Sequence, residues 1–475
     1  SVVLIDYLGA LLIEKTKHKK LYLIIIIILS TYIYYILKTK IFKGEYMKNS
    51  KFIQSTIVLI IGGLITKILG MVIKIVTTRL IGTEGIGLYM LITPTFTLLI
   101  ALAQLGFPVA ISKLVAEDKS NNKNLVFSII PISLIINLVI ILLLLIFSPI
   151  IANNLLHESR TYLAIIGMAF VLPFISISSI IRGYFFGKER MIPHVVSNIC
   201  EDVIRIIIII IGIPVFIKKG LDYAIFFLVI SNIVSEITSI LILFFFLPKN
   251  FSLNKQDFKP IKSDIKNIFS ISIPTTGSRL IGNIGYFFEP IILTSTLLYV
   301  GYNNSFIVNE YGIISGYVIP LLLLPSFFTM AISQALIPVI SKSYSNNHFN
   351  YAKSKIKQAI IFSLIIGVPI TILFEVIPEV PLKLIYNTTE GVSYLRVLAP
   401  ICLMQYIQSP LASALQAMGK AKIAMNATLI GIIIRTSLLF ILSLFKIGMW
   451  GLVIATGINI LAVTSYQAKK IKNCF

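Results

Sequence analysis

The sequence predicts an all-α protein that crosses a membrane many times, and three observations predict it. First, 57% of the 475 residues are hydrophobic and only 13% are charged, whereas soluble domains are about 25% charged. Second, apolar runs long enough to span the hydrocarbon, about 20 residues each, recur along nearly the whole chain. Third, lysines and arginines gather in alternate loops between those runs. In lipid, backbone groups must be satisfied within each segment, so a helix bundle is expected.

Twelve apolar segments follow Met47, and each approaches or exceeds the length of a membrane span. They cover 52–81, 88–112, 124–152, 161–182, 193–217, 222–247, 265–299, 309–341, 357–377, 393–417, 422–446 and 449–468. When the region before the first segment is placed inside the cell, the inside loops hold 22 lysines and arginines and the outside loops hold 6. This asymmetry predicts that both termini are cytoplasmic.

The two ends of the sequence raise separate questions. Residues 1–46 contain one apolar segment, LYLIIIIILSTYIYYIL (21–37), and precede Met47, which reads as a natural start. We interpret 1–46 as an upstream extension that is not part of the working protein, with an extra helix or a signal anchor as the alternative. The C-terminal KKIKNCF follows directly on the last apolar run, so a premature end is also open.

The longest polar connection, 248–267, follows the sixth segment and separates an N-terminal lobe (47–247) from a C-terminal lobe (268–475). The lobes repeat: FPVAISKLVAEDKSNN (107–122) matches IPVISKSYSNN (337–347), and a Gly-Lys pair follows two segments later in both. Because each half has an even number of segments, the repeats are parallel, related by an axis along the membrane normal. Two six-helix lobes that face each other leave a central cleft between them.

Ten charged side chains fall at membrane depth, where each costs about 2.5–3.5 kcal/mol, so most must face water, protein or ligand. They are Lys67, Lys74, Arg79, Glu201, Asp202, Arg205, Glu236, Arg279, Glu289 and Arg435. Glu201 and Arg205 share a helix face and either neutralise each other or line a site. Arg79 either extends to the outer interface or faces the cleft. Arg182 is interpreted as a topology charge at an inside helix end.

The basic residues predict an anionic ligand. Lys67 and Lys74 are seven residues apart, so they lie on one helix face with no acidic neighbour on that helix. Arg279 and Glu289 are separated by about 15 Å along one helix, so each needs a partner elsewhere. The basic set outnumbers the acidic set, as a phosphate or pyrophosphate head group requires. We therefore predict a substrate cavity lined by Lys67, Lys74, Arg79, Arg205, Arg279, Glu289 and Arg435, with Glu201 and Glu236 as candidates for ion coupling.

Other classes of function find little support in the sequence. The net charge of +22 resides mostly in loop residues that set topology, so no nucleic-acid partner is expected. Three distant cysteines and four scattered histidines form no metal motif, and neither a metal nor a cofactor is expected. There is no DxD pair, and RGYFFGKE (182–189) has the wrong spacing for a phosphate-binding loop. We therefore expect a protein that is not an enzyme.

Three stretches resemble the stage V sporulation protein B family. They are GGLITKILGMVIKIVTTRLIGTEGIGLY (62–89), IPTTGSRLIGNIGYFFEPIIL (273–293) and GKERMIPHVVSNICEDVIR (187–205). The family is a polysaccharide-exporter branch of the superfamily that also holds multidrug-and-toxin extruders (MATE) and the lipid II flippase. The resemblance implies a MATE-like, V-shaped pair of lobes with a central cavity, in the plasma membrane of a bacterium. Members usually have fourteen helices, so the twelve here indicate a truncated gene or a shorter relative.

The resemblance also implies a function. Relatives move undecaprenyl-pyrophosphate-linked sugars from the inner to the outer leaflet by alternating access, and this branch is linked to spore cortex peptidoglycan. Basic residues of the first and seventh helices face the cavity in flippase relatives, which here implies Lys67, Lys74, Arg79 and Arg279. The expected partners are thus a lipid-linked anionic saccharide precursor and membrane lipid. Three alternatives stay open: a cation-coupled multidrug exporter that uses Glu236 or Glu289, a membrane transferase, and a scaffold for the cell-wall machinery.

Overall fold

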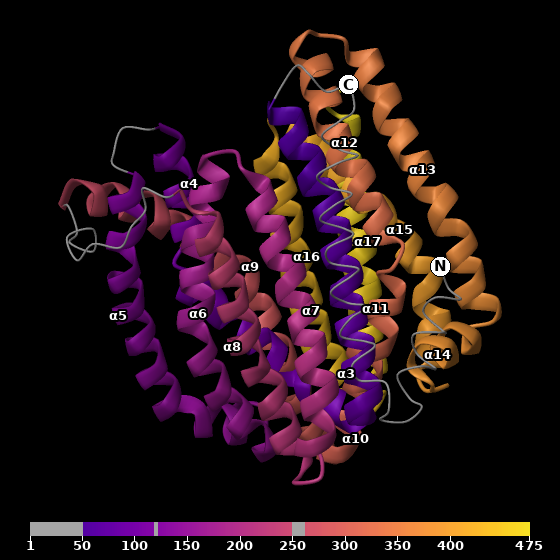
Figure 1. The fold of residues 1–475 in the computed structure, drawn as a ribbon. Coiled ribbons are helices and arrows are strands. Elements are labelled where there is room, and N and C mark those ends of the chain that lie inside the picture. The colour runs from indigo at the N-terminus through magenta and orange to yellow at the C-terminus, as the bar shows by residue number, and fades with distance from the viewer. Residues whose placement is uncertain (1–50, 118–121, 249–261) are drawn as a thin grey trace, which may run out of the picture.

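A computed structural model describes residues 51–117, 122–248 and 262–475, and every regular element within them is helical (Figure 1). All twelve predicted segments lie in helices, so the all-α class is confirmed. Nine helices in these ranges are long and apolar enough to cross a membrane, one of which, Ile61–Glu117, contains two predicted segments. The predicted extension 1–46 and most of the linker 248–267 fall outside the described residues.

The first two predicted segments form one long helix, α3 (Lys51–Gln104), that changes direction at Gly82. Gly82 has φ 72° and ψ −175°, a conformation that lacks the steric penalty only for glycine. A second break at Leu105 and Gly106, both at positive φ, precedes α4 (Phe107–Glu117). Two spans therefore follow each other without an intervening polar loop, which the sequence did not predict.

The rest of the N-terminal half packs around α6. It comprises α5 (Asn122–Pro149), the π-helix η2 (Ile150–Leu155), the 3-10 turn η3 (Ser159–Thr161), α6 (Tyr162–Gly187), α7 (Met191–Phe216) and α8 (Leu221–Phe246). Helix α6 contacts α4, α5 and α8, and α7 contacts α3 and α8. The face of α6 toward these neighbours is rich in small side chains, including buried Gly167, Ser176 and Gly183, which let the helices approach closely.

The C-terminal half begins with α9 (Lys262–Val300). The eighth predicted segment is not one continuous helix. It is divided among α10 (Asn304–Gly312), the π-helix η5 (Ile313–Val318), α11 (Ile319–Leu322) and α12 (Ser326–Ser345). It continues with α13 (Phe349–Val376), the short α14 (Glu379–Tyr386), α15 (Val392–Ala417), α16 (Ala421–Ser443) and α17 (Trp450–Lys472). Helix α15 contacts α12, α13 and α17, and α16 contacts α9 and α17. The sequence did not predict α14.

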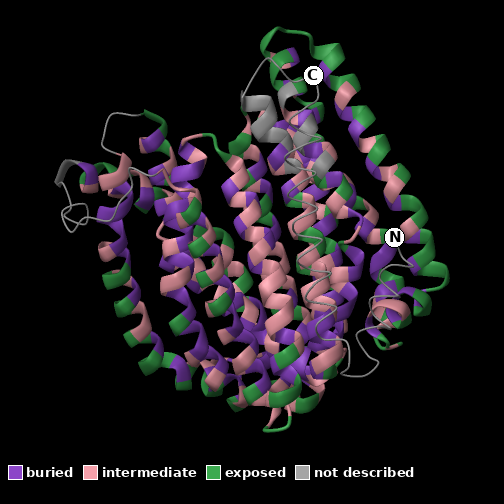
Figure 2. Cartoon of the chain, viewed as in Figure 1, coloured by how far each residue is buried: buried purple, intermediate pink, exposed green. Residues whose placement is uncertain are grey.

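Helices α5 and α13, the third span of each half, lie on the two flanks of the molecule (Figure 2). Their outward faces carry exposed large apolar side chains, such as Ile135, Ile146 and Ile365. In a soluble protein such continuous apolar faces would be a liability, whereas in a bilayer they contact the acyl chains. The equivalent positions of α5 and α13 agree with the predicted repeat of the two halves.

The two halves converge at one end of the bundle. We call this the outer end, after the orientation that the sequence predicts; it carries the loops 157–160, 217–220, 301–303 and 444–449. There α3 contacts α9, α10 and η5. At the opposite, inner end, α12 and α13 stand apart from α4 and α5 (Figure 1). The result is the predicted V-shaped pair of helical lobes.

Candidate functional site

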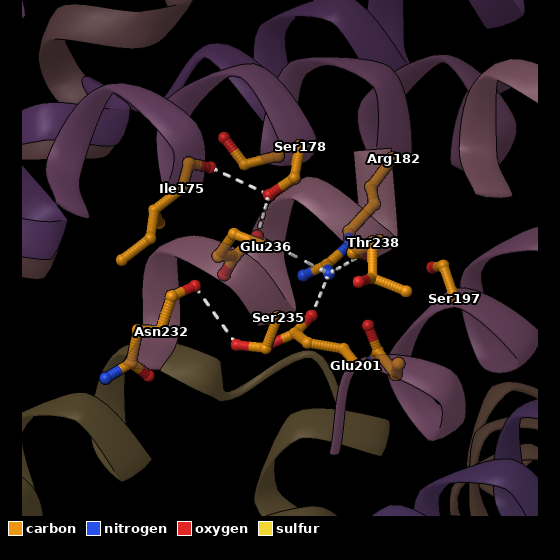
Figure 3. Close-up of polar contacts among 12 residues, drawn as sticks. Ile175, Ser178, Arg182, Ser197, Glu201, Asn232, Ser235, Glu236 and Thr238 are labelled. Atoms are coloured by element: carbon orange, nitrogen blue, oxygen red, sulfur yellow. Dashed lines mark hydrogen bonds and ion pairs between the residues drawn. The ribbon is translucent and has the colours of Figure 1, made fainter. Parts of the chain in front are cut away.

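Five charged side chains lie close together inside the N-terminal lobe, and Figure 3 shows three of them, Arg182, Glu201 and Glu236. We call the five the N-terminal polar cluster: Arg182 on α6, Glu201, Asp202 and Arg205 on α7, and Glu236 on α8. Three packed helices therefore each contribute to one polar site at membrane depth. Charges in such a place mark a functional site by default, because lipid or an apolar core would penalise them.

Glu201 is the centre of this cluster. Its Oε2 accepts a hydrogen bond from Arg182 Nη2 at 2.6 Å, and its Oε1 accepts one from Arg205 Nη2 at 2.7 Å. Arg182 Nη2 also donates to Ser239 Oγ at 2.6 Å. The interpretation of Arg182 as a loop charge was therefore wrong: helix α6 extends to Gly187, which places this side chain within the lobe. Mutual neutralisation of Glu201 and Arg205 is observed, but Arg182 shares in it.

Glu236 is less fully compensated. Its Oε2 accepts a hydrogen bond from Ser178 Oγ at 2.6 Å, and the nearest guanidinium nitrogen, on Arg182, lies 4.0 Å away. The carboxylate is 6% exposed. Together with half-buried Asp202, the cluster holds one more carboxyl group than guanidinium groups. Such an excess of acid, away from bulk water, suits the binding of a proton or a small cation.

The C-terminal lobe holds a buried ion pair. Glu289 on α9 is 5% exposed, and Arg435 Nη2 on α16 lies 2.9 Å from its Oε2. The pair borders a cavity of about 60 Å³, beside Gly282 and Gly285. Gly285 is required there, because a Cβ would collide with Ile432 of α16. As predicted, Glu289 finds its partner on another helix rather than in Arg279.

Lys74 crosses the boundary between the lobes. Its Nζ donates to the backbone oxygen of Ser315 in η5 at 3.0 Å and lies 3.8 Å from the sulfur of Met90. Within the described part of the chain, no carboxylate lies within ion-pair distance of Lys74 or of exposed Lys67. A π-helix presents backbone carbonyls irregularly, and here it supplies an acceptor to a charge that lacks a counter-ion.

Two arginines from the predicted cavity also bridge the lobes. Arg279 Nη1 on α9 donates to Gln104 Oε1 on α3 at 3.1 Å, near the inner end, and the side chain is exposed. Arg79 instead lies at the outer end, where it donates to the backbone oxygens of Leu384 and Ile385 at 2.7 and 2.8 Å. These carbonyls end α14, where the helix dipole favours a cation. Arg79 thus closes the outer end in this conformation.

Further contacts at the outer end form what we call the outer seal. Thr83 Oγ1 on α3 donates to Glu390 Oε2 at 2.8 Å and accepts from the Tyr317 hydroxyl at 2.9 Å. Next to them α3 crosses α10 so closely that a Cβ on Gly87 would collide with the Val308 carbonyl. Gly87 therefore serves a helix crossing, a role that depends on the partner helix and that sequence reasoning did not find.

A second group of contacts ties the loop after η2 to the seal. Arg160 bonds to Glu158 at 2.8 Å and to Glu84 of α3 at 2.6 Å. The Arg160 guanidinium donates hydrogen bonds to both of these carboxylates. Asn304 of α10 donates to Glu158 Oε2 and to the His157 backbone oxygen, both at 2.9 Å. The outer end is thereby fixed by residues of both halves.

The charges at membrane depth thus divide into two kinds. Glu201, Glu236 and Glu289 each have an arginine of the same lobe within 4.0 Å, and Asp202 adjoins Glu201 on α7. In the described part of the chain, the basic ones without a carboxylate partner lie on α3 and α9, the first helix of each half: Lys67, Lys74, Arg79 and Arg279. This is the arrangement expected where an anion enters between the lobes.

Comparison with known proteins places the chain in a family. Residues 52–344 match the polysaccharide biosynthesis protein family. Stage V sporulation protein B of Bacillus subtilis (strain 168) is 36% identical over 437 residues, which cover 90% of this chain and 84% of that protein. The chain belongs to the polysaccharide biosynthesis protein family. The resemblance to stage V sporulation protein B is thereby confirmed.

More distant sequence relatives and a solved transporter structure are also similar to this chain. The lipid II flippase MurJ of Bacillus subtilis (strain 168) is 23% identical over 470 residues, covering 89% of this chain and 83% of that protein. Residues 314–441 also match the MatE family. An inward-facing multidrug resistance MATE transporter has a similar structure, with a TM-score of 0.66 at 17% identity over 86% of this chain and 95% of that one. The chain is a multi-pass membrane protein of the transporter and flippase class.

Proposed function

We propose that this protein flips an undecaprenyl-pyrophosphate-linked saccharide precursor from the inner to the outer leaflet by alternating access. The observation that carries the proposal is the division of charge: the glutamates at membrane depth pair with arginines of their own lobe, while the basic groups left over lie on α3 and α9, where the lobes face each other. A doubly charged pyrophosphate would take over the hydrogen bonds that Lys74 and Arg279 now make to neutral oxygens. Each would then have an oppositely charged acceptor, and arginine–phosphate pairs are often bidentate as well.

The orientation and the cycle follow from the same features. With both termini in the cytoplasm, as the loop charges predict, the outer seal closes the side away from the cytoplasm. Lys67 and Arg279 are exposed on the inner side of that seal and would meet the head group first. The prenyl chain would stay in lipid, outside the lobes. The family resemblance implies spore cortex peptidoglycan as the destination of the cargo, and the similarity to stage V sporulation protein B supports a role in sporulation.

The N-terminal polar cluster would couple the cycle to an ion. Glu201 and Glu236 share Arg182, so a proton or small cation that binds there changes the balance among three helices of one lobe. Such a change can bias the angle between the lobes only if the ion binds one state more tightly. Replacing Glu236 with Gln should therefore remove the dependence of transport on the ion gradient before it removes transport itself.

The test is translocation in liposomes. The full-length protein, reconstituted with a labelled polyprenyl-pyrophosphate-linked saccharide, should expose the label to a probe that reaches only the far leaflet. Lys74→Ala and Arg279→Ala should each slow this exchange by about tenfold or more, since a charge-assisted hydrogen bond contributes about 1.5–3 kcal/mol. Lys357→Ala, which removes an exposed charge from α13, is the matched control. Wild-type rates in both cavity variants would refute the proposal.

One observation favours a second function, a cation-coupled multidrug exporter. The carboxyl excess of the N-terminal polar cluster suits cation exchange, and residues 314–441 match the MatE family. Dye efflux from a sensitised host separates the two functions. Efflux that depends on Glu236 or Glu289, without translocation of the lipid-linked saccharide, would favour the exporter.

A further inference from the structure

Two adjoining cavities lie at the outer end of the C-terminal lobe. Their volumes are about 440 and 340 Å³, and they share the wall residues Glu310, Tyr394 and Trp450. Both fall within the range of about 300–1,000 Å³ that is usual for small-molecule sites. None of the basic residues assigned to the cavity between the lobes lines either of them. They therefore form a separate site, which we call the exterior pocket.

Flat aromatic faces form the apolar part of this pocket. Tyr302 and Phe306, at the start of α10, stack with ring centroids 5.0 Å apart. Tyr394 of α15 meets Trp450 of α17 edge to face, with centroids 4.9 Å apart. An aromatic belt at the membrane interface would place such rings at this depth. A belt, however, needs neither a cavity nor the carboxylates described next.

The polar part of the pocket mixes acceptors with a donor. Glu310 Oε2 accepts a hydrogen bond from the Tyr394 hydroxyl at 2.6 Å, which fixes the carboxylate in the wall that both cavities share. Glu310 has no lysine or arginine within ion-pair distance in the described ranges. Glu390 lines the smaller cavity and Lys446 the larger. A carboxylate held by one hydroxyl, with its other oxygen unused, is a ready acceptor for further hydroxyl groups.

We propose that the exterior pocket binds a saccharide. A pyranose ring has an apolar face of C–H groups, which would lie on the aromatic rings, and a rim of hydroxyls, which would donate to Glu310 and Glu390. The Lys446 ammonium would donate to hydroxyl or ring oxygens. A purely cationic ligand does not suit a wall that contains Lys446, and an anionic ligand does not suit two carboxylates. The site stands on its own geometry and does not require the translocation proposal.

The exterior pocket is also connected to the outer seal. Glu390, which lines the smaller cavity, accepts the hydrogen bond of Thr83 from the opposite lobe. A sugar hydroxyl that engages Glu390 would compete with Thr83, so occupancy of the pocket would weaken the seal. Reciprocity requires that opening of the seal raises the affinity for the sugar by the same factor.

Trp450 offers a direct measurement, because it is the single tryptophan of the chain. The full-length protein in lipid nanodiscs is titrated with the disaccharide of N-acetylglucosamine while tryptophan emission is recorded. We expect a saturable change in emission. Glu310→Gln should weaken the apparent affinity by about tenfold or more, because a neutral amide replaces a charged acceptor. Tyr394→Phe, which retains the ring but frees Glu310, should weaken it by a smaller factor. Glu379→Gln, an exposed carboxylate on α14 outside the pocket, should leave it unchanged.

The other ligand classes are tested with the same reporter. Choline chloride represents a cation, and glycerol 3-phosphate represents a lipid head group. Saturation by either of these without a response to the disaccharide would overturn the proposal. So would the absence of any saturable change, or equal affinities in Glu310→Gln and Glu379→Gln. Melting curves of the three variants in nanodiscs show that a lost response does not arise from unfolding.

Discussion

Replacing Gly87 with Ala should open the outer seal. A Cβ at this position would collide with the Val308 carbonyl of α10 and would also approach the Val308 side chain at 3.0 Å. Gly312 of α10 faces Gly87 across this contact, and a Cβ placed on Gly312 would lie 2.8 Å from the Gly87 Cα, so the two backbones touch at both glycines. Helices α3 and α10 must therefore separate.

The expected magnitude follows from the cost of overpacking, about 1–3 kcal/mol. This cost falls on the closed state alone, because the two helices lie apart once the seal opens. At 1.4 kcal/mol for each factor of ten, the ratio of open to closed molecules should rise by about 5- to 150-fold. Gly70→Ala on the same helix, where a Cβ meets nothing within 4 Å, should leave the ratio unchanged.

The assay is cysteine labelling from outside the membrane. Ser315→Cys is introduced after Cys200, Cys402 and Cys474 are replaced with Ser, and a membrane-impermeant maleimide is added. Ser315 lies seven residues inward of Val308, and its backbone oxygen accepts from Lys74, so it lies at the boundary between the lobes. Equal labelling rates in Gly87→Ala and Gly70→Ala would refute the assignment of this crossing to the seal. Fast labelling without either change would show that the seal is open.

Three further substitutions test two of the polar sites and one contact between helices. Arg435→Ala leaves buried Glu289 without its partner, so we expect the free energy of unfolding, measured by denaturant titration, to fall by about 3–5 kcal/mol. The double variant Glu289→Gln/Arg435→Ala should recover part of this loss, and additive losses would contradict the pairing. Arg182→Ala removes the guanidinium that Glu201 and Glu236 share, so a loss of similar size is expected, and an unchanged melting temperature would contradict it. Gly62→Ala should destabilise the protein by about 1–3 kcal/mol, because the added Cβ would collide with Val195 of α7. Gly63→Ala should not, because a Cβ there meets no atom within 4 Å, and equal losses of stability in the two variants would count against this helix contact.

The sequence predicted the spans well, because hydropathy and the lengths of apolar runs are local properties. It also predicted that Glu289 must pair with another helix, since the distance from Arg279 is fixed by helix geometry. It did not predict α14, because eight residues are too few to show the hydrophobic period of a helix. It also missed the continuity of α3 through Gly82, since one glycine conformation decides between a loop and a bend.

Arg182 shows why the charged site was harder to predict than the fold. Its position near the end of an apolar run fits a topology signal as well as an interior charge, and only the packing of α6 on α7 and α8 decides between them. The excess of basic over acidic residues predicted an anionic ligand, but the structure shows that the two kinds of charge are unevenly distributed. Three acids and two arginines form a slightly acidic cluster in one lobe, while the basic groups without such partners lie on α3 and α9.

Binding of a lipid pyrophosphate to the purified protein tests this division of charge most directly. The affinity for a short-chain polyprenyl pyrophosphate is measured in nanodiscs for the variant Lys67→Gln/Lys74→Gln/Arg279→Gln. The matched control Lys342→Gln/Lys353→Gln/Lys357→Gln removes three exposed charges at the inner end. We expect the first variant to bind about a hundredfold or more weakly than wild type, because each charge-assisted hydrogen bond contributes about 1.5–3 kcal/mol, and the control to bind like wild type. Equal affinities in the two variants would contradict an anion site between the lobes.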